Sequence, residues 1–141
     1  MEYHVGRLVD HVQLRVADLR RSKAFYVAAI GALGTEVEVG EGPGYFYADE
    51  LYVLQDDGPV TAAVHLAFQA EDEPTVRRFY EAALAAGGAD NGAPGERAYH
   101  PGYYAAFVLD PDGNNVEAVY HGPMTRSAAS VVLTPVDTPV S

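Results

Sequence analysis

The sequence predicts an α+β fold in which two βαβββ modules pack edge to edge and form a curved mixed sheet around a cleft, with the helices outside. The main observation is an internal repeat: residues 10–14 and 64–68 are similar, and His11 and His65 lie 54 positions apart. The same offset pairs Phe25-Tyr26 with Phe79-Tyr80, Ala28-Ala29 with Ala82-Ala83, and Gly34 with Gly88. A repeated strand, helix and helix end indicate two copies of one structural unit.

The first module is expected at about residues 7–57. Residues 8–16 alternate in polarity and predict a strand. Its apolar face carries Val12, Leu14 and Val16, and its cleft face carries His11, Gln13 and Arg15. Asp18 is a candidate N-cap for a helix that runs to Leu33, and Gly34 is placed to end it. Residues 36–44 are predicted to form a strand followed by a glycine-rich turn, and two further strands are predicted at 45–47 and 51–54, before a linker at residues 56–59.

The second module is expected at about residues 60–121, which completes a single domain of residues 1–121. Residues 64–70 predict a strand whose cleft face includes His65, and a helix follows from Asp72 or Glu73-Pro74 to Gly87-Gly88. We expect a loop at 89–102, a strand at 103–109, a turn at 110–115, a strand at 116–120, and a tail at 122–141 with one added strand at 131–133. On the strand at 116–120, Glu117 faces the cleft.

The composition limits the classes of function. A net charge of -11, from nine basic and twenty acidic residues, argues against nucleic acid, which binds basic side chains through its phosphates. No apolar run is long enough to span a membrane, and the first residues do not resemble a signal peptide. The absence of cysteine excludes disulfides and thiolate metal sites and suits a reducing, cytoplasmic compartment. Ten tyrosines against five phenylalanines fit an apolar pocket that forms hydrogen bonds with a small molecule.

Three predicted cleft residues, His11, His65 and Glu117, have the chemistry of metal ligands. A carboxylate on the inner face of a sheet is costly unless it has a cation or hydrogen-bond partners. Two histidines and one carboxylate form the open ligand set of non-haem iron(II) sites and of several catalytic zinc sites. Such a set leaves positions for water or a chelating substrate. The pattern alone leaves two interpretations open, a divalent metal site and a set of hydrogen-bonded cleft residues.

Two motifs resemble those of the vicinal oxygen chelate superfamily, which includes lactoylglutathione lyase, bleomycin-resistance proteins and extradiol dioxygenases. The opening motif consists of residues 10–19 with Ser22, Phe25 and Tyr26, and the closing motif of residues 110–117. The likeness spans about residues 7–121 and is more specific for the superfamily than for any one member. It implies paired βαβββ modules around a metal cleft, with His11, His65 and Glu117 at the ligand positions.

The sequence departs from the pattern that the resemblance implies for lyases and isomerases, which have a fourth ligand on the last strand of the first module. That strand would present Tyr52 and Leu54 to the cleft, or Gln55 if the register shifts by one, while Glu50 lies at the strand start. The departure puts lactoylglutathione lyase activity in doubt and leaves the three-ligand pattern of the dioxygenase branch. Zinc, iron(II), manganese, nickel and cobalt all accept this ligand set.

Other residues are candidates for catalysis and substrate binding. Tyr52 is either an acid or base near the metal or a tyrosine of the pocket wall. His100 is either a general base or a surface histidine, since its loop enters a cleft strand. The candidates for substrate binding are Arg15, which could neutralise an anionic substrate, Tyr47, Tyr103 and His121. His121 is either a partner that orients a metal ligand or simply the end of a strand.

Three hypotheses about function follow. The first is a small metal-dependent enzyme whose divalent ion chelates two adjacent oxygens of a small organic substrate, with the lyase, isomerase or dioxygenase chemistry that the resemblance implies. The second is a non-catalytic, antibiotic-binding protein of the resistance type, which would bind a ligand tightly without turnover. The third is a structural or regulatory domain with a vestigial ion site. An exposed sheet edge would also favour a homodimer.

Overall fold

The computed structural model describes residues 3–137 and confirms the predicted α+β fold of two βαβββ modules. The first module contains β2 (Val12–Arg15), α1 (Leu19–Gly31), β3 (Val39–Gly42), β4 (Tyr45–Ala48) and β5 (Leu51–Leu54). The second contains β6 (His65–Gln69), α2 (Glu73–Ala85), β7 (Ala89–Glu96), β8 (Tyr104–Leu109) and β9 (Asn115–Tyr120). Two further strands are β1 (Tyr3–Val5) and β10 (Val131–Leu133).

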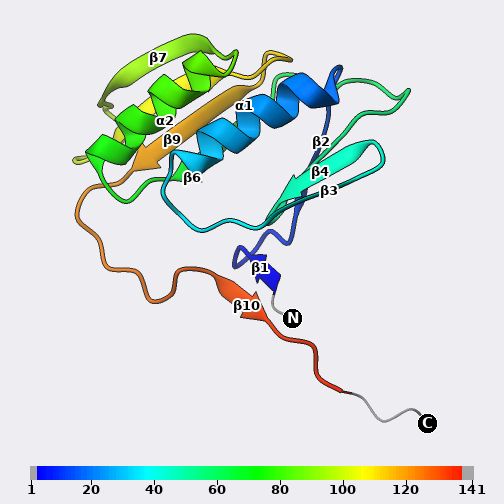
Figure 1. Cartoon of the computed structure of the whole chain (residues 1–141). Helices are drawn as coiled ribbons and strands as arrows, with labels where there is room; N and C mark the ends of the chain where they lie inside the picture. The colour runs from blue at the N-terminus through cyan, green and yellow to red at the C-terminus, as the bar shows by residue number, and fades with distance from the viewer. Residues whose placement is uncertain (1–2, 138–141) are drawn as a thin grey trace.

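The strands of the two modules form two separate four-stranded mixed sheets, ordered β2-β5-β4-β3 and β6-β9-β8-β7. In each sheet the first strand of the module pairs in parallel with the last one, and the other pairs are antiparallel. The two helices contact each other and lie side by side across the modules (Figure 1). Each sheet therefore has one face towards its helix and one face turned away, which we call its open face.

The core forms where the predicted apolar faces meet. Leu14 and Val16 of the first opening strand are buried, and so are Phe25 of α1 and Phe79 of α2. These side chains belong to one cluster that joins both modules. Because strand side chains alternate between faces, burial of Leu14 places Gln13 and Arg15 on the open face.

The helix ends follow the predicted signals. The carboxylate of Asp18 accepts a hydrogen bond from the backbone N–H of Arg21 at 3.1 Å. Asp72 accepts one from the N–H of Thr75 at 2.8 Å, so both aspartates act as N-caps. After α1, Gly34 has a φ of 75°, a conformation that glycine adopts without steric cost.

Two predicted boundaries are wrong. The first half of the predicted loop at residues 89–102 is β7, which pairs with β8 through register shifts between Asp90 and Gly92 and between Gly92 and Gly95. Its glycines and proline are typical of loops, and bulged pairing accommodates them in a strand. The predicted strand at 8–16 is shortened to β2, because residues 8–11 do not join the sheet.

The predicted strand in the tail is present as β10, and its partner is β1. The two strands pair antiparallel, with Tyr3 opposite Leu133 and Val5 opposite Val131. This two-stranded ribbon lies apart from the two larger sheets (Figure 1). The run of apolar residues at 131–133 predicted the strand but held no information about its partner at the start of the chain.

A buried hydrogen-bond network joins the two modules. The hydroxyl of Tyr26 on α1 donates to Oδ2 of Asp110, in the turn between β8 and β9, at 2.6 Å. Nδ2 of Asn114 donates to the same oxygen at 3.1 Å and to the carbonyl oxygen of Thr61 at 3.1 Å. Burial raises the pKa of Tyr26, and the charge of Asp110 raises it further.

Replacing Tyr26 with phenylalanine is expected to lower the free energy of unfolding by about 1–3 kcal/mol, because a buried carboxylate loses a donor. A raised tyrosine pKa stabilises the fold below the unfolded pKa of 10.0, and this stability is lost as the pH rises above that value. The variant should therefore lose stability less steeply above pH 10, as measured by urea unfolding. Tyr99→Phe, at a tyrosine that is 73% exposed, is the control. Equal stability of the two variants would contradict the role of the network.

Candidate functional site

The second sheet holds the most distinctive polar group of the molecule, the buried carboxylate of Glu117. The residue is 1% exposed and lies on β9 between the buried Val116 and Ala118. Those two neighbours face the core, so the carboxylate lies on the open face, as the alternation predicts. A buried carboxylate must find partners that compensate for the lost water.

His65 and Tyr103 are these partners. Nε2 of His65 lies 2.8 Å from Oε1 of Glu117, and the histidine side chain is 55% exposed. The hydroxyl of Tyr103 donates to Oε2. Burial raises the pKa of Tyr103, and the hydrogen bond and charge of Glu117 raise it further, so this phenol stays protonated as a donor. The carboxylate of this cluster is thus buried in the sheet, while His65 is accessible to solvent.

His11, the third predicted ligand, does not join this cluster. It precedes β2 on the first module, where Nδ1 lies 2.7 Å from Oδ1 of Asp10 and the side chain is 58% exposed. Its ring makes an edge contact with Tyr52, at 5.7 Å between centroids. Within residues 3–137 no group of three or more histidine, aspartate or glutamate side chains is placed to hold a metal ion. Within one chain His11 is therefore separate from the pair formed by His65 and Glu117.

The open face of the first sheet carries a tyrosine-rich pocket of about 500 Å³. The lining includes Gln13, Tyr45, Tyr52, Leu54, Gln55 and Asp56. Tyr47 stacks on Tyr52 at 5.4 Å between ring centroids, and the charge of Glu38 raises the pKa of Tyr47. Tyr52 and Tyr47 therefore belong with His11 and not with Glu117. The pocket walls are aromatic and carry phenol and amide groups, as expected for a small-molecule site.

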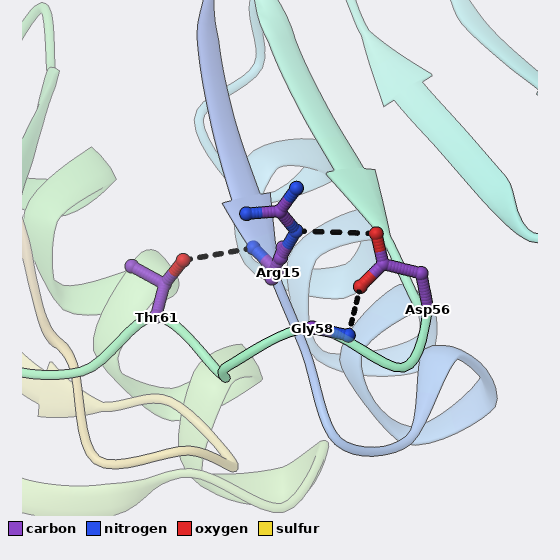
Figure 2. A network of polar contacts seen from close by, with 4 residues as sticks. All are labelled: Arg15, Asp56, Gly58 and Thr61. Carbon is purple, nitrogen blue, oxygen red and sulfur yellow. Dashed lines mark hydrogen bonds and ion pairs between the residues drawn. The ribbon is translucent and has the colours of Figure 1, made fainter.

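Arg15 lies at the end of β2, beside the linker between the modules. Its backbone N–H donates to Oγ1 of Thr61 at 2.9 Å, and its Nε donates to Oδ2 of Asp56 at 3.2 Å, as Figure 2 shows. The N–H of Gly58 donates to the other oxygen of Asp56 at 2.8 Å. This bond, together with Arg15, lowers the pKa of the Asp56 carboxyl. Arg15, which was predicted to contact the substrate, is thus bonded to Asp56. The other guanidinium nitrogens of Arg15 point away from Asp56 (Figure 2).

The predicted loop histidine and the predicted strand-end histidine come together. Nε2 of His100 lies 2.8 Å from Nδ1 of His121, and the rings stack with an interplanar angle of 21°. Both rings meet the ring of Tyr103 edge-on, at 5.3 Å and 5.2 Å between centroids. Tyr103 thereby connects the histidine pair to Glu117.

Sequence reasoning missed two residues that surround these groups. Asp10 was not expected to bond with His11, although its position next to a candidate ligand was a signal for such a partner. Tyr45 was not expected to line a pocket, and only its strand parity could have indicated it. None of the helices within residues 3–137 has the length and apolar character needed to cross a bilayer.

The comparisons with known proteins agree with the fold described above. Residues 8–118 match the family described as the Glyoxalase/Bleomycin resistance protein/Dioxygenase superfamily. No curated protein matches the chain.

Solved structures with the same fold cover most of the chain. A glyoxalase/bleomycin resistance protein from Albidiferax ferrireducens T118 is 28% identical with a TM-score of 0.68, and the match covers 78% of this chain and 95% of that one. A glyoxalase-related enzyme from Fulvimarina pelagi is 20% identical with a TM-score of 0.67, covering 92% and 99%. The oxidase ChaP-H2 is 25% identical with a TM-score of 0.54, covering 86% and 95%. The last two proteins are named as enzymes.

Proposed function

Because the chain belongs to the glyoxalase/bleomycin resistance protein/dioxygenase superfamily, we propose that it is a small metal-dependent enzyme that acts on an organic substrate with two adjacent oxygens. The ion would be held by His11, His65 and Glu117. The observation that carries the proposal is the buried carboxylate of Glu117, which meets a half-exposed histidine on the open face of a sheet. A structural carboxylate has no need of such an accessible partner.

The residues fit a divalent ion in their chemistry. Imidazole and carboxylate ligands suit zinc, iron(II), manganese, nickel and cobalt. Tyr103 would keep its hydrogen bond to one oxygen of Glu117 and leave the other for the ion, as partners of metal-bound carboxylates commonly do. Asp10 is placed to orient the ring of His11 in the same way. Both ligand half-sites therefore carry an orienting group.

The fit within one chain is incomplete, because His11 lies on a different sheet from the other two ligands. We propose that two copies of the chain complete the site, with His11 of one copy facing His65 and Glu117 of the other. Exposed apolar side chains flank His11 and support a contact there: Leu8 is 87% exposed and Val9 is 48% exposed. A C₂ dimer would form two equivalent sites in this way.

The bound ion would act as a Lewis acid on the adjacent oxygens of the substrate. Side chains near the ion would bind and orient the substrate. Tyr52, next to His11, would contact the substrate beside the ion as an acid, a base or a wall of the pocket. Tyr47, stacked on it, would extend the aromatic wall, and Arg15 would attract an anionic group of the substrate.

A second candidate function is binding of a small molecule without turnover, of the resistance type. It is favoured by one observation, that the tyrosine-rich pocket of the first sheet contains none of the three proposed ligands in its lining. Binding of an aromatic ligand that persists after removal of metal would support this candidate. Loss of that binding in metal-free protein would favour the enzyme.

The test of the proposal is the metal content of protein purified without chelators and without nickel-affinity resin. Elemental mass spectrometry is expected to find close to one divalent ion per chain, and sedimentation is expected to find a dimer. His11→Ala and Glu117→Ala should each lose the ion, because three ligands are needed to hold it. If the wild-type chain takes up no metal, even after incubation with several divalent ions, the enzyme proposal is wrong and the binding protein becomes the better account.

A further inference from the structure

We infer that His100 and His121 work as one hydrogen-bonded unit that presents Nε2 of His121 as an acceptor for a hydroxyl group of the substrate, at the end remote from the metal-binding oxygens. The inference rests on the proposed function, which places the vicinal oxygens of the substrate near Glu117. It adds the class of the substrate, an elongated molecule with a hydroxyl group at its far end.

The pattern of donors in the pair is fixed by one backbone carbonyl. Nδ1 of His100 lies 2.8 Å from the carbonyl oxygen of Pro101, which can only accept, so Nδ1 carries the proton. In a neutral imidazole the other nitrogen is then an acceptor. Nε2 of His100 must therefore accept from Nδ1 of His121, at 2.8 Å. The neutral His121 in turn has its proton on Nδ1 and a free lone pair on Nε2.

A close backbone contact holds the two rings in this relative position. Gly102 has a φ of 87° and Gly122 a φ of 90°, conformations that disfavour other residues. A Cβ added at Gly102 would lie 3.3 Å from the carbonyl oxygen of His121 and 3.4 Å from Cα of Gly122. The turn that carries His100 thus packs directly on the segment that carries His121. The backbone contact between these two segments therefore fixes the positions of both histidines.

The groups around the pair favour a polar but uncharged ligand end. Tyr103 meets both rings edge-on, Tyr99 meets Tyr103 at 4.9 Å between centroids, and Glu117 lies behind Tyr103 through its hydrogen bond. A nearby carboxylate disfavours an anionic group, and aromatic rings favour a planar one. A neutral hydroxyl on an aromatic or enolic skeleton satisfies both conditions.

The position of the pair sets the length of the ligand. His121 follows Glu117 by four positions, just after β9, and Tyr103 lies between their side chains: its hydroxyl donates to Glu117 and its ring lies 5.2 Å from the His121 ring between centroids. A ligand that binds the ion and also reaches His121 must extend past the ring of Tyr103. A fused two-ring skeleton with vicinal oxygens at one end and a hydroxyl at the other does so.

The first test reads the protons of the pair directly. In protein with ¹⁵N-labelled histidine, NMR at a pH where both rings are neutral is expected to show His100 and His121 in the Nδ1–H form. In His100→Phe the partner ring is lost, so His121 is expected to change to the Nε2–H form. Finding His121 as Nε2–H in the wild-type chain would overturn the inference, whether or not the protein binds metal.

The second test compares two chelating probes on the metal-loaded protein, 2,3-dihydroxynaphthalene and 2,3,6-trihydroxynaphthalene. One added hydrogen bond should make the trihydroxy compound bind about three- to tenfold more tightly to the wild-type chain. His121→Phe, which keeps an aromatic ring, should remove this difference between the two compounds. Equal affinities in the wild-type chain would overturn the inference alone. If neither probe binds, the proposed chelation is wrong and the inference fails with it.

Discussion

Glu117→Gln is expected to lower the affinity for a divalent ion by more than about a hundredfold while the chain stays folded. Loss of a partner outside the ligand set commonly costs 10–100-fold, and loss of the ligand's own charge should cost more. The amide has nearly the shape of the carboxylate and still accepts from the Tyr103 hydroxyl, so the packing on β9 is retained. The affinity is measured by competition with a chromophoric zinc chelator, and folding by circular dichroism.

Glu96→Gln is the matched control for this experiment. Glu96 ends β7 and is exposed, and it lies outside the proposed site, so removing its charge should leave the metal affinity unchanged. The same affinity in Glu117→Gln as in the control would show that the buried carboxylate is a structural group, held by His65 and Tyr103 alone.

Gly88→Ala is expected to destabilise the chain by about 2–3 kcal/mol, because it overfills the contact between the two modules. The added Cβ would collide with the side chain of Val108 on β8 and would lie 2.7 Å from Cε2 of Phe25 on α1. It would also lie 2.8 Å from the carbonyl oxygen of Ala83, which is backbone and cannot rotate away. Since Phe25 and Val108 come from different modules, relief of the clash must move one module against the other.

Gly31→Ala provides the control, because a Cβ there meets no atom within 4 Å. Gly31 ends α1, where alanine is favoured over glycine, so this variant should be as stable as the wild type or more stable by up to about 1 kcal/mol. Urea unfolding of both variants measures the difference. A Gly88→Ala chain as stable as Gly31→Ala would show that the modules are packed more loosely than this contact implies.

Much of the fold could be predicted because strand parity and helix periodicity are local. Burial of Leu14, Val16 and Phe79 follows from the spacing of apolar residues, and so does the open-face position of Glu117. Strand β7 could not be predicted, because Gly92, Pro94 and Gly95 signal a loop unless a neighbouring strand tolerates bulges.

The candidate site was less accessible to prediction than the fold. Parity places His11, His65 and Glu117 on open faces, but it cannot say whether two open faces belong to one cavity. That depends on how whole modules pack, and here it separates His11 from the other two. The pairing of His100 with His121 has the same origin, since the contact of Gly102 with Gly122 is tertiary. The repeat indicated equivalent histidines, but within one chain they belong to separate modules.

Hybrid dimers test the shared metal site most directly. His11→Ala and Glu117→Gln chains with different tags are co-expressed, and dimers that carry both tags are isolated for elemental mass spectrometry. If two copies share each site, one of the two sites in the hybrid has both defects and the other has none, so one ion per dimer is predicted. The hybrid of His65→Ala with Glu117→Gln has a defect in each site and should hold no ion. A His11→Ala and Glu117→Gln hybrid without metal, beside a wild-type dimer that binds two ions, would contradict the shared site and place all three ligands within one chain.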